Sequence, residues 1–143
     1  MGRTPCAGRA MATPSPGTIP VILVADDSPD IRALLTTLLE DEGYSIIEAN
    51  DGQDALEVAL GCDVNLILLD VAMPRLTGTA FCLAYRNHGG YAPVILITAA
   101  NNEAVAAAVE ACRAVGHIRK PFNIEHVLDM VERYVGGPLG RTA

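Results

Sequence analysis

Residues 21–49 read VILVADDSPDIRALLTTLLEDEGYSIIEA, and this stretch predicts the fold. Its first five residues form an apolar run with the length of a buried strand. Ser28 and Pro29 are typical of a helix start, and leucines follow at helical spacing as far as Gly43. A second apolar run, residues 44–49, comes next. This order of strand, helix and strand is typical of a parallel sheet covered by helices.

The same alternation continues to the end of the chain. The further predicted elements are helix 52–60, strand 66–70, helix 79–87, strand 94–97, helix 102–114, strand 117–119 and a last helix from residue 124. Five strands and five helices with right-handed crossovers predict an α/β fold, a flavodoxin-like doubly wound (βα)5 three-layer sandwich. We expect a parallel five-stranded sheet of order 2-1-3-4-5.

Length and composition favour one domain with a sizeable core. The chain has 143 residues, half of them hydrophobic, which suits a single domain. We expect this domain over residues 20–135, between flexible tails at 1–19 and 136–143. The first tail is rich in Gly, Pro, Ser and Thr and lacks the apolar core of a secretory signal.

Charge and hydropathy exclude some partners. The net charge is -7 and no cluster of Lys and Arg occurs, which argues against direct binding to nucleic acid. No apolar run reaches the roughly 18 residues that a membrane helix needs. The four cysteines lack C-x-x-C spacing and are interpreted as free thiols in a reducing cytoplasm; they are Cys6, Cys62, Cys82 and Cys112. The sequence therefore predicts a cytoplasmic protein without a membrane partner.

Polar residues stand where four of the predicted strands end. Asp26-Asp27 follows the first strand, and Asp70 ends the third. Thr98 follows the fourth strand and Lys120 the fifth. In open α/β sheets ligands bind beyond the carboxyl ends of the strands, and the predicted order places these strands side by side. We therefore expect these residues to converge.

The residue types suit phosphoryl transfer. Clustered carboxylates repel one another and suit Mg²⁺, which binds through a few carboxylates together with a phosphate. Asp70 is the candidate nucleophile, because a carboxylate can accept a phosphoryl group as a mixed anhydride. Lys120 and the Thr98 hydroxyl would then stabilise the transferring oxygens.

Each residue also has a purely structural interpretation. The pair Asp26-Asp27 would favour the N-terminus of the following helix, and Thr98 would be an ordinary strand residue. Lys120 would be a solvated charge or part of a simple salt bridge. Met73-Pro74 would be a turn in which Gly78 supplies flexibility. The functional interpretation depends on the combination.

Four motifs together resemble the receiver domain of bacterial two-component response regulators. They are VADDS at 24–28, LLDVAMPRLTG at 68–78, ITAA at 97–100 and KPF at 120–122. The resemblance spans residues 20–135 and implies a phosphoacceptor signalling module, not an enzyme with a separate substrate. It implies a sensor histidine kinase or a histidine phosphotransfer protein as donor, and a downstream protein effector. The protein would be a monomer or a phosphorylation-dependent dimer.

The resemblance also implies roles for individual residues. Asp27 and Asp70 would bind Mg²⁺ directly, Asp26 would act mainly through a metal-bound water, and the Ala72 main-chain carbonyl would complete the protein ligands. The Lys120-Pro121 peptide would be cis. These roles follow from the family pattern alone.

The switch is where the chain departs from the family. Thr98 would move toward the phosphoryl group, and receivers commonly place Tyr or Phe three residues before the lysine as its partner. His117 stands there instead. A histidine is smaller and more polar than either ring, so both a switching role and a plain surface role stay open.

Two alternatives with other chemistry fit the sequence less well. An aspartyl-phosphate hydrolase of haloacid-dehalogenase type needs a second Asp two residues after the nucleophile, and Ala72 stands there. A flavin-binding module of this fold needs a phosphate-binding loop after the first strand, where ADDSPD is acidic. The sequence favours the receiver over both.

Overall fold

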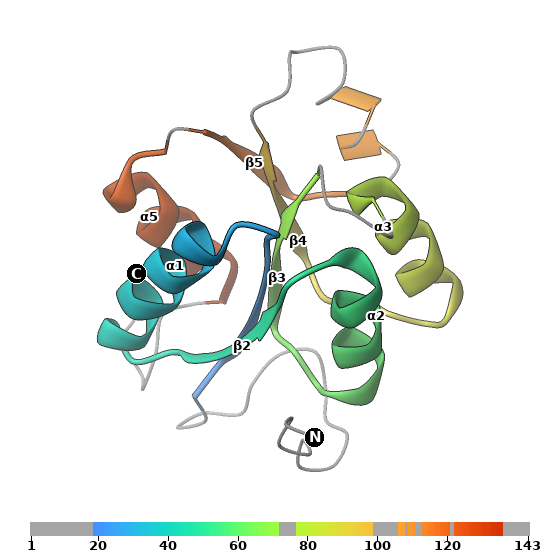
Figure 1. Ribbon diagram of the computed structural model, residues 1–143, viewed down its shortest axis with the longest axis horizontal. Helices are drawn as coiled ribbons and strands as arrows, with labels where there is room; N and C mark the ends of the chain where they lie inside the picture. The colour runs from blue at the N-terminus through green and yellow to red at the C-terminus, as the bar shows by residue number, and fades with distance from the viewer. Residues whose placement is uncertain are drawn as a thin grey trace.

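The computed structural model (Figure 1) contains one parallel five-stranded sheet with helices on both faces. It describes residues 19–71, 77–98, 106–107, 109–110, 113–120 and 122–135. The strands lie in the order β2-β1-β3-β4-β5, as predicted. Their bounds are β1 Val21–Ala25, β2 Ser45–Ala49, β3 Leu66–Asp70, β4 Val94–Thr98 and β5 Gly116–Arg119.

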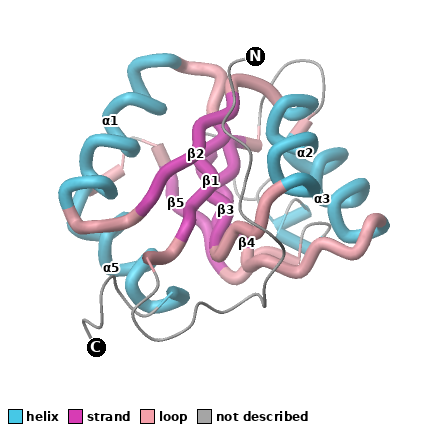
Figure 2. The backbone as a smooth tube through the Cα atoms, turned by 90° about the horizontal axis from the view of Figure 1, so that it is seen from below, coloured by secondary structure: helices cyan, strands magenta, loops and turns pink. Residues whose placement is uncertain are grey.

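The helices cover the two faces in pairs. Their bounds are α1 Pro29–Asp41, α2 Gly52–Gly61, α3 Gly78–Asn87 and α5 Ile124–Val135. In Figure 2 the sheet lies between α1 and α5 on one side and α2 and α3 on the other. Residues 106–107 and 109–110 are also helical, and the rest of the predicted helix 102–114 falls largely outside the described residues. The predicted tails also lie outside them, apart from Ile19.

Each face of the sheet has its own core. Residues of β1 alternate between the two, with Leu23 facing α2 and α3 and Ile22 facing α1 and α5. Every residue of β3 and β4 is buried, which explains why both strands are apolar up to their last residues, Asp70 and Thr98. Truncating such a residue to alanine typically costs about 2–5 kcal/mol of folding free energy.

Particular residues define where α1 begins and where it ends. Ser28 caps α1 by accepting a hydrogen bond from the Ile31 N–H, and Pro29 follows at the first helical position. Gly43 ends the same helix with a φ of 102°, a conformation that glycine adopts without strain. The Ser28 cap holds the turn from β1 into α1 in place.

The interpretation of the cysteines as free thiols is wrong for two of them. Cys62 and Cys82 are both buried in the core beneath α2 and α3, and each is disulfide-bonded. Spacing along the chain did not reveal this, because a disulfide requires only that two cysteines meet in the folded protein. Cys6 and Cys112 lie outside the described residues. In the described part of the chain, no helix is long and apolar enough to cross a membrane.

Candidate functional site

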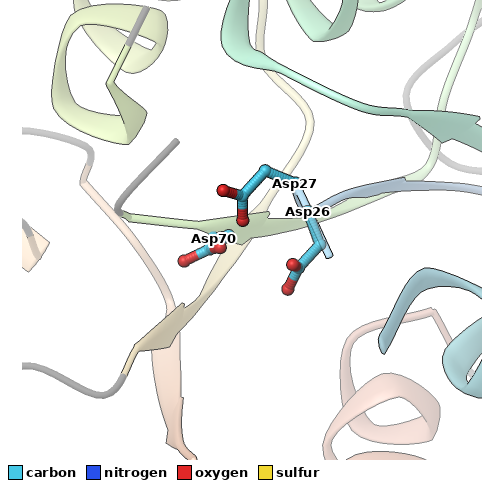
Figure 3. A group of neighbouring side chains, drawn as sticks. All are labelled: Asp26, Asp27 and Asp70. Atoms are coloured by element: carbon cyan, nitrogen blue, oxygen red, sulfur yellow. The ribbon is translucent and has the colours of Figure 1, made fainter. Parts of the chain in front are cut away.

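Three carboxylates meet where β1 and β3 end. The carboxylate oxygens of Asp26, Asp27 and Asp70 lie within 4.8 Å of one another. Figure 3 shows the three side chains around one small region, two following β1 and one closing β3. Asp26 and Asp70 are buried, whereas Asp27 is exposed. The fold thus brings Asp70 to a pair of acids that lies 43 or more positions before it in the sequence.

Asp26 is held by contacts on both its main chain and its side chain. Its N–H donates to the Ala49 carbonyl oxygen at 3.2 Å, which ties it to the end of β2. Its Oδ1 accepts a hydrogen bond from the Ser28 N–H at 2.9 Å. Its Oδ2 lies 3.2 Å from Lys120 Nζ, an ion pair that lacks the alignment of a hydrogen bond.

Lys120 bridges the two buried acids. Its Nζ lies 3.5 Å from Asp70 Oδ2 as well as close to Asp26, and its N–H donates to the Thr98 carbonyl oxygen at 2.8 Å. Burial by itself lowers the pKa of Lys120, but the charges of Asp70 and Asp26 outweigh burial, so this pKa is raised. Lys120 is therefore a stable cation at neutral pH.

The two residues assigned to the switch occupy different environments. Thr98 is buried at the end of β4, one residue beyond Ile97, which pairs with Asp70 across the sheet. His117 is exposed on β5, where it pairs in register with Leu96. The imidazole therefore lies outside the core in this structure. Ala72 and Pro121 lie outside the described residues, as do the proposed main-chain ligand and the cis peptide.

Gly78 allows the start of α3 to lie close to the site. The sequence suggested instead that this glycine supplies flexibility to a turn. A Cβ on this residue would lie 2.9 Å from Val71 Cα and 3.0 Å from the Asp70 carbonyl oxygen. The Gly78 N–H donates to the Val71 carbonyl oxygen at 2.9 Å. The start of α3 thus packs directly on the main chain that carries Asp70, which only glycine permits.

Arg32 is a residue of the site that the sequence reasoning missed. From α1 its Nη1 donates to the Asp26 carbonyl oxygen at 2.7 Å, and its Nε donates to Glu48 Oε1 at 3.3 Å. One signal was available, because a cation near the N-terminus of a helix opposes the helix dipole. Such a placement indicates that the charge of Arg32 has a role other than stabilising α1.

The donor set fits a hard divalent cation. Carboxylate oxygens are the ligands that Mg²⁺ and Ca²⁺ prefer. Three acids and one lysine leave the cluster with an excess of negative charge. The exposed Asp27 gives access from solvent, and Asp26 Oδ2 is buried without a hydrogen bond. The carboxylate cluster therefore fits a divalent cation.

Comparison with known proteins identifies the family. Residues 22–132 match the model of the response regulator receiver domain. Among curated relatives, response regulator RR06 of Streptococcus pneumoniae is 35% identical over 117 residues, which cover 79% of this chain and 54% of that protein. Response regulator MprA of Mycobacterium leprae is 36% identical over 107 residues, covering 75% and 47%. The chain thus spans about half the length of these relatives.

Comparison with solved structures supports the same family. The chemotaxis protein CheY4 of Vibrio cholerae superposes with a TM-score of 0.75 at 31% identity, covering 82% of this chain and 99% of that one. TrrA of Thermotoga maritima, solved in complex with Mg²⁺-BeF, gives 0.73 at 32% identity, covering 81% and 99%. The matches are to receivers and lend no support to a haloacid-dehalogenase hydrolase. Family model, relatives and fold agree, and the chain belongs to the receiver domains of two-component response regulators.

Proposed function

We propose that this chain is a phosphoacceptor signalling module in which Asp70 receives a phosphoryl group. The observation that carries the proposal is the position of Asp70, which closes β3 beside two further acids and a lysine. The donor is a sensor histidine kinase or a histidine phosphotransfer protein, since the relatives are response regulators. The chain contributes to its own phosphorylation and dephosphorylation through the residues around Asp70.

Mg²⁺ is the proposed cofactor. Asp27 and Asp70 would bind it directly, Asp26 would act mainly through an intervening water, and the Ala72 carbonyl would complete the set. The contacts of Asp26 support its indirect role, because Ser28 already occupies its Oδ1 and Lys120 faces its Oδ2. When bound, Mg²⁺ neutralises the carboxylates and stabilises negative charge on the transferring phosphoryl group.

The chain's own residues carry out the remaining chemistry. A carboxylate oxygen of Asp70 attacks phosphorus, the bond from phosphorus to the donor breaks, and the product is an acyl phosphate. Lys120, which lies beside Asp70 Oδ2, pairs with a phosphoryl oxygen. The buried Thr98 hydroxyl donates to another. Each interaction stabilises charge that develops during transfer.

The output is a change in partner binding. Thr98 moves toward the phosphoryl group, and His117 follows from its exposed position on β5. The partner is a downstream protein effector or a second copy of the chain, so the protein is a monomer or a phosphorylation-dependent dimer. The cytoplasmic location stays a prediction, and the disulfide-bonded Cys62 and Cys82 are a reason to test it.

Labelling by a small phosphodonor tests the proposal. Acetyl phosphate and Mg²⁺ are expected to phosphorylate the purified protein, and the acyl phosphate should be released by hydroxylamine. Asp70→Asn and removal of Mg²⁺ with EDTA should each abolish labelling. Equal labelling of the Asp70→Asn variant would refute the assignment.

A further inference from the structure

We propose that Arg32 is a positioning residue of the divalent-cation site, which holds the main chain between Asp26 and Asp27. The inference concerns the cation site assigned above and rests on the proposed function. The described hydrogen bonds of Arg32 go to the Asp26 carbonyl oxygen and to Glu48, and not to the carboxylates proposed to bind the metal. Its role is to fix the peptide from which the two acids project.

The shortest hydrogen bond of Arg32 is to main chain and not to a carboxylate. Its Nη1 donates to the Asp26 carbonyl oxygen at 2.7 Å, a short bond from a charged donor. The N–H of the same Asp26 donates to Ala49 at the end of β2. The peptide groups on both sides of Asp26 are therefore fixed, one by β2 and the other by α1.

This peptide connects the buried acid to the exposed one. The Asp26 carbonyl and the Asp27 N–H belong to one planar unit, so holding the carbonyl sets the direction in which Asp27 leaves the strand. Among the described residues, none donates a hydrogen bond to the Asp27 carboxylate. The position of that carboxylate therefore depends on the main chain that Arg32 holds.

Glu48 orients the guanidinium. Its Oε1 accepts from Arg32 Nε at 3.3 Å, with the Arg32 side chain 17% exposed and that of Glu48 43% exposed. So exposed an ion pair contributes little stability. It does select one orientation of a planar group, because Nε and Nη1 donate at a fixed angle to each other. A lysine at this position has one charged nitrogen and cannot reproduce both contacts.

A positioning role and a charge role predict opposite results. The Arg32 cation repels a bound Mg²⁺, so if only charge mattered, removing it would tighten metal binding. If the contact to the Asp26 carbonyl matters, replacing the guanidinium, which donates from two nitrogens, by a single ammonium of the same charge weakens Mg²⁺ binding. Arg32→Lys makes this replacement, so it separates the two roles.

The experiment is a calorimetric titration of the full chain with Mg²⁺ alone, for the parent and for Arg32→Lys, Arg32→Gln and Glu48→Gln. Far-UV circular dichroism establishes that each variant is folded at the temperature used. Arg133→Lys is the matched control, because Arg133 pairs with the exposed Asp129 at 3.2 Å in the last turn of α5. A role in stability alone would lower the melting temperature without changing the Kd.

We expect Arg32→Lys to weaken Mg²⁺ binding roughly ten-fold, the usual order for a residue that orients metal ligands. Glu48→Gln should weaken it less, and Arg133→Lys should bind like the parent. An Arg32→Lys Kd equal to that of the parent overturns the inference, as does tighter binding by Arg32→Gln. If the parent is labelled on Asp70 while these results are negative, only the inference fails. A parent that neither binds Mg²⁺ nor is labelled overturns both proposals.

Discussion

Asp27→Asn should make the metal-free protein more stable. The Asp27 carboxylate lies within 4.8 Å of those of Asp26 and Asp70, so folding forces three negative charges together. Lys120 contacts the two buried acids. Removing the charge of Asp27 relieves repulsion at the cost of a proposed metal ligand.

The distance between the carboxylates sets the size of this gain in stability. Two unit charges 4.8 Å apart interact by about 1 kcal/mol in water and by about 3.5 kcal/mol at an effective dielectric constant of about 20. Because Asp27 is exposed, the lower figure applies. A gain of about 1 kcal/mol in the free energy of unfolding raises the melting temperature of a domain of this size by about 4 °C.

Thermal unfolding in EDTA at low ionic strength measures the gain. Added salt should reduce it, because screening weakens repulsion between charges near solvent. With saturating Mg²⁺ the order should reverse, since the parent binds the ion more tightly and binding stabilises the folded state. Glu57→Gln, which removes one negative charge from the exposed side of α2, is the control for net charge. If the metal-free Asp27→Asn protein melts below the parent, repulsion by Asp27 is not destabilising and the residue has a structural role.

Variants at three further residues test other parts of the site. Gly78→Ala places a Cβ 2.9 Å from Val71 Cα, so it should lower the urea midpoint by an amount equivalent to about 1–3 kcal/mol and slow labelling of Asp70; an unchanged midpoint would contradict the close approach. Lys120→Gln should be less stable than the parent. Folding raises the pKa of Lys120. The stability that the Lys120 charge adds to the folded protein is therefore present below the unfolded pKa of about 10.4 and is lost as pH rises through the higher folded pKa. The difference in urea midpoint should thus be constant from neutral pH up to about pH 10 and narrow above it; a difference that persists at higher pH would refute the ion pair as its cause. His117→Ala should keep Asp70 labelling but reduce the change in amide exchange of β5 on phosphorylation, whereas His117→Tyr should retain it; identical exchange in both variants would make His117 a bystander.

The sequence predicted the elements and the convergence of the site because both depend on local patterns and simple topology. Strand β3 was recognisable as an apolar run that ends in Asp70, and the structure has it over the same residues. The carboxyl ends of neighbouring parallel strands share one edge, so Asp26 and Lys120 were expected near Asp70. The starts of the four helices α1, α2, α3 and α5 differ from the predicted ones by a single residue at most, as for α3, where Thr77 caps a helix that begins at Gly78.

What the sequence did not predict depends on packing between distant segments. The contact of Arg32 with the Asp26 carbonyl requires a side chain that turns back from the helix, which no periodicity reveals. The need for glycine at Gly78 arises only because α3 returns onto the main chain of β3. The disulfide-bonded state of Cys62 and Cys82 likewise depends on neighbours in the fold and not on spacing.

Borohydride reduction of the labelled protein shows whether Asp70 is the phosphoacceptor. Borohydride converts an aspartyl phosphate to homoserine, which peptide mass spectrometry locates by residue. After treatment with acetyl phosphate and Mg²⁺, we expect homoserine at position 70, with Asp26 and Asp27 unchanged. Homoserine at position 26 or 27 with Asp70 intact would contradict it.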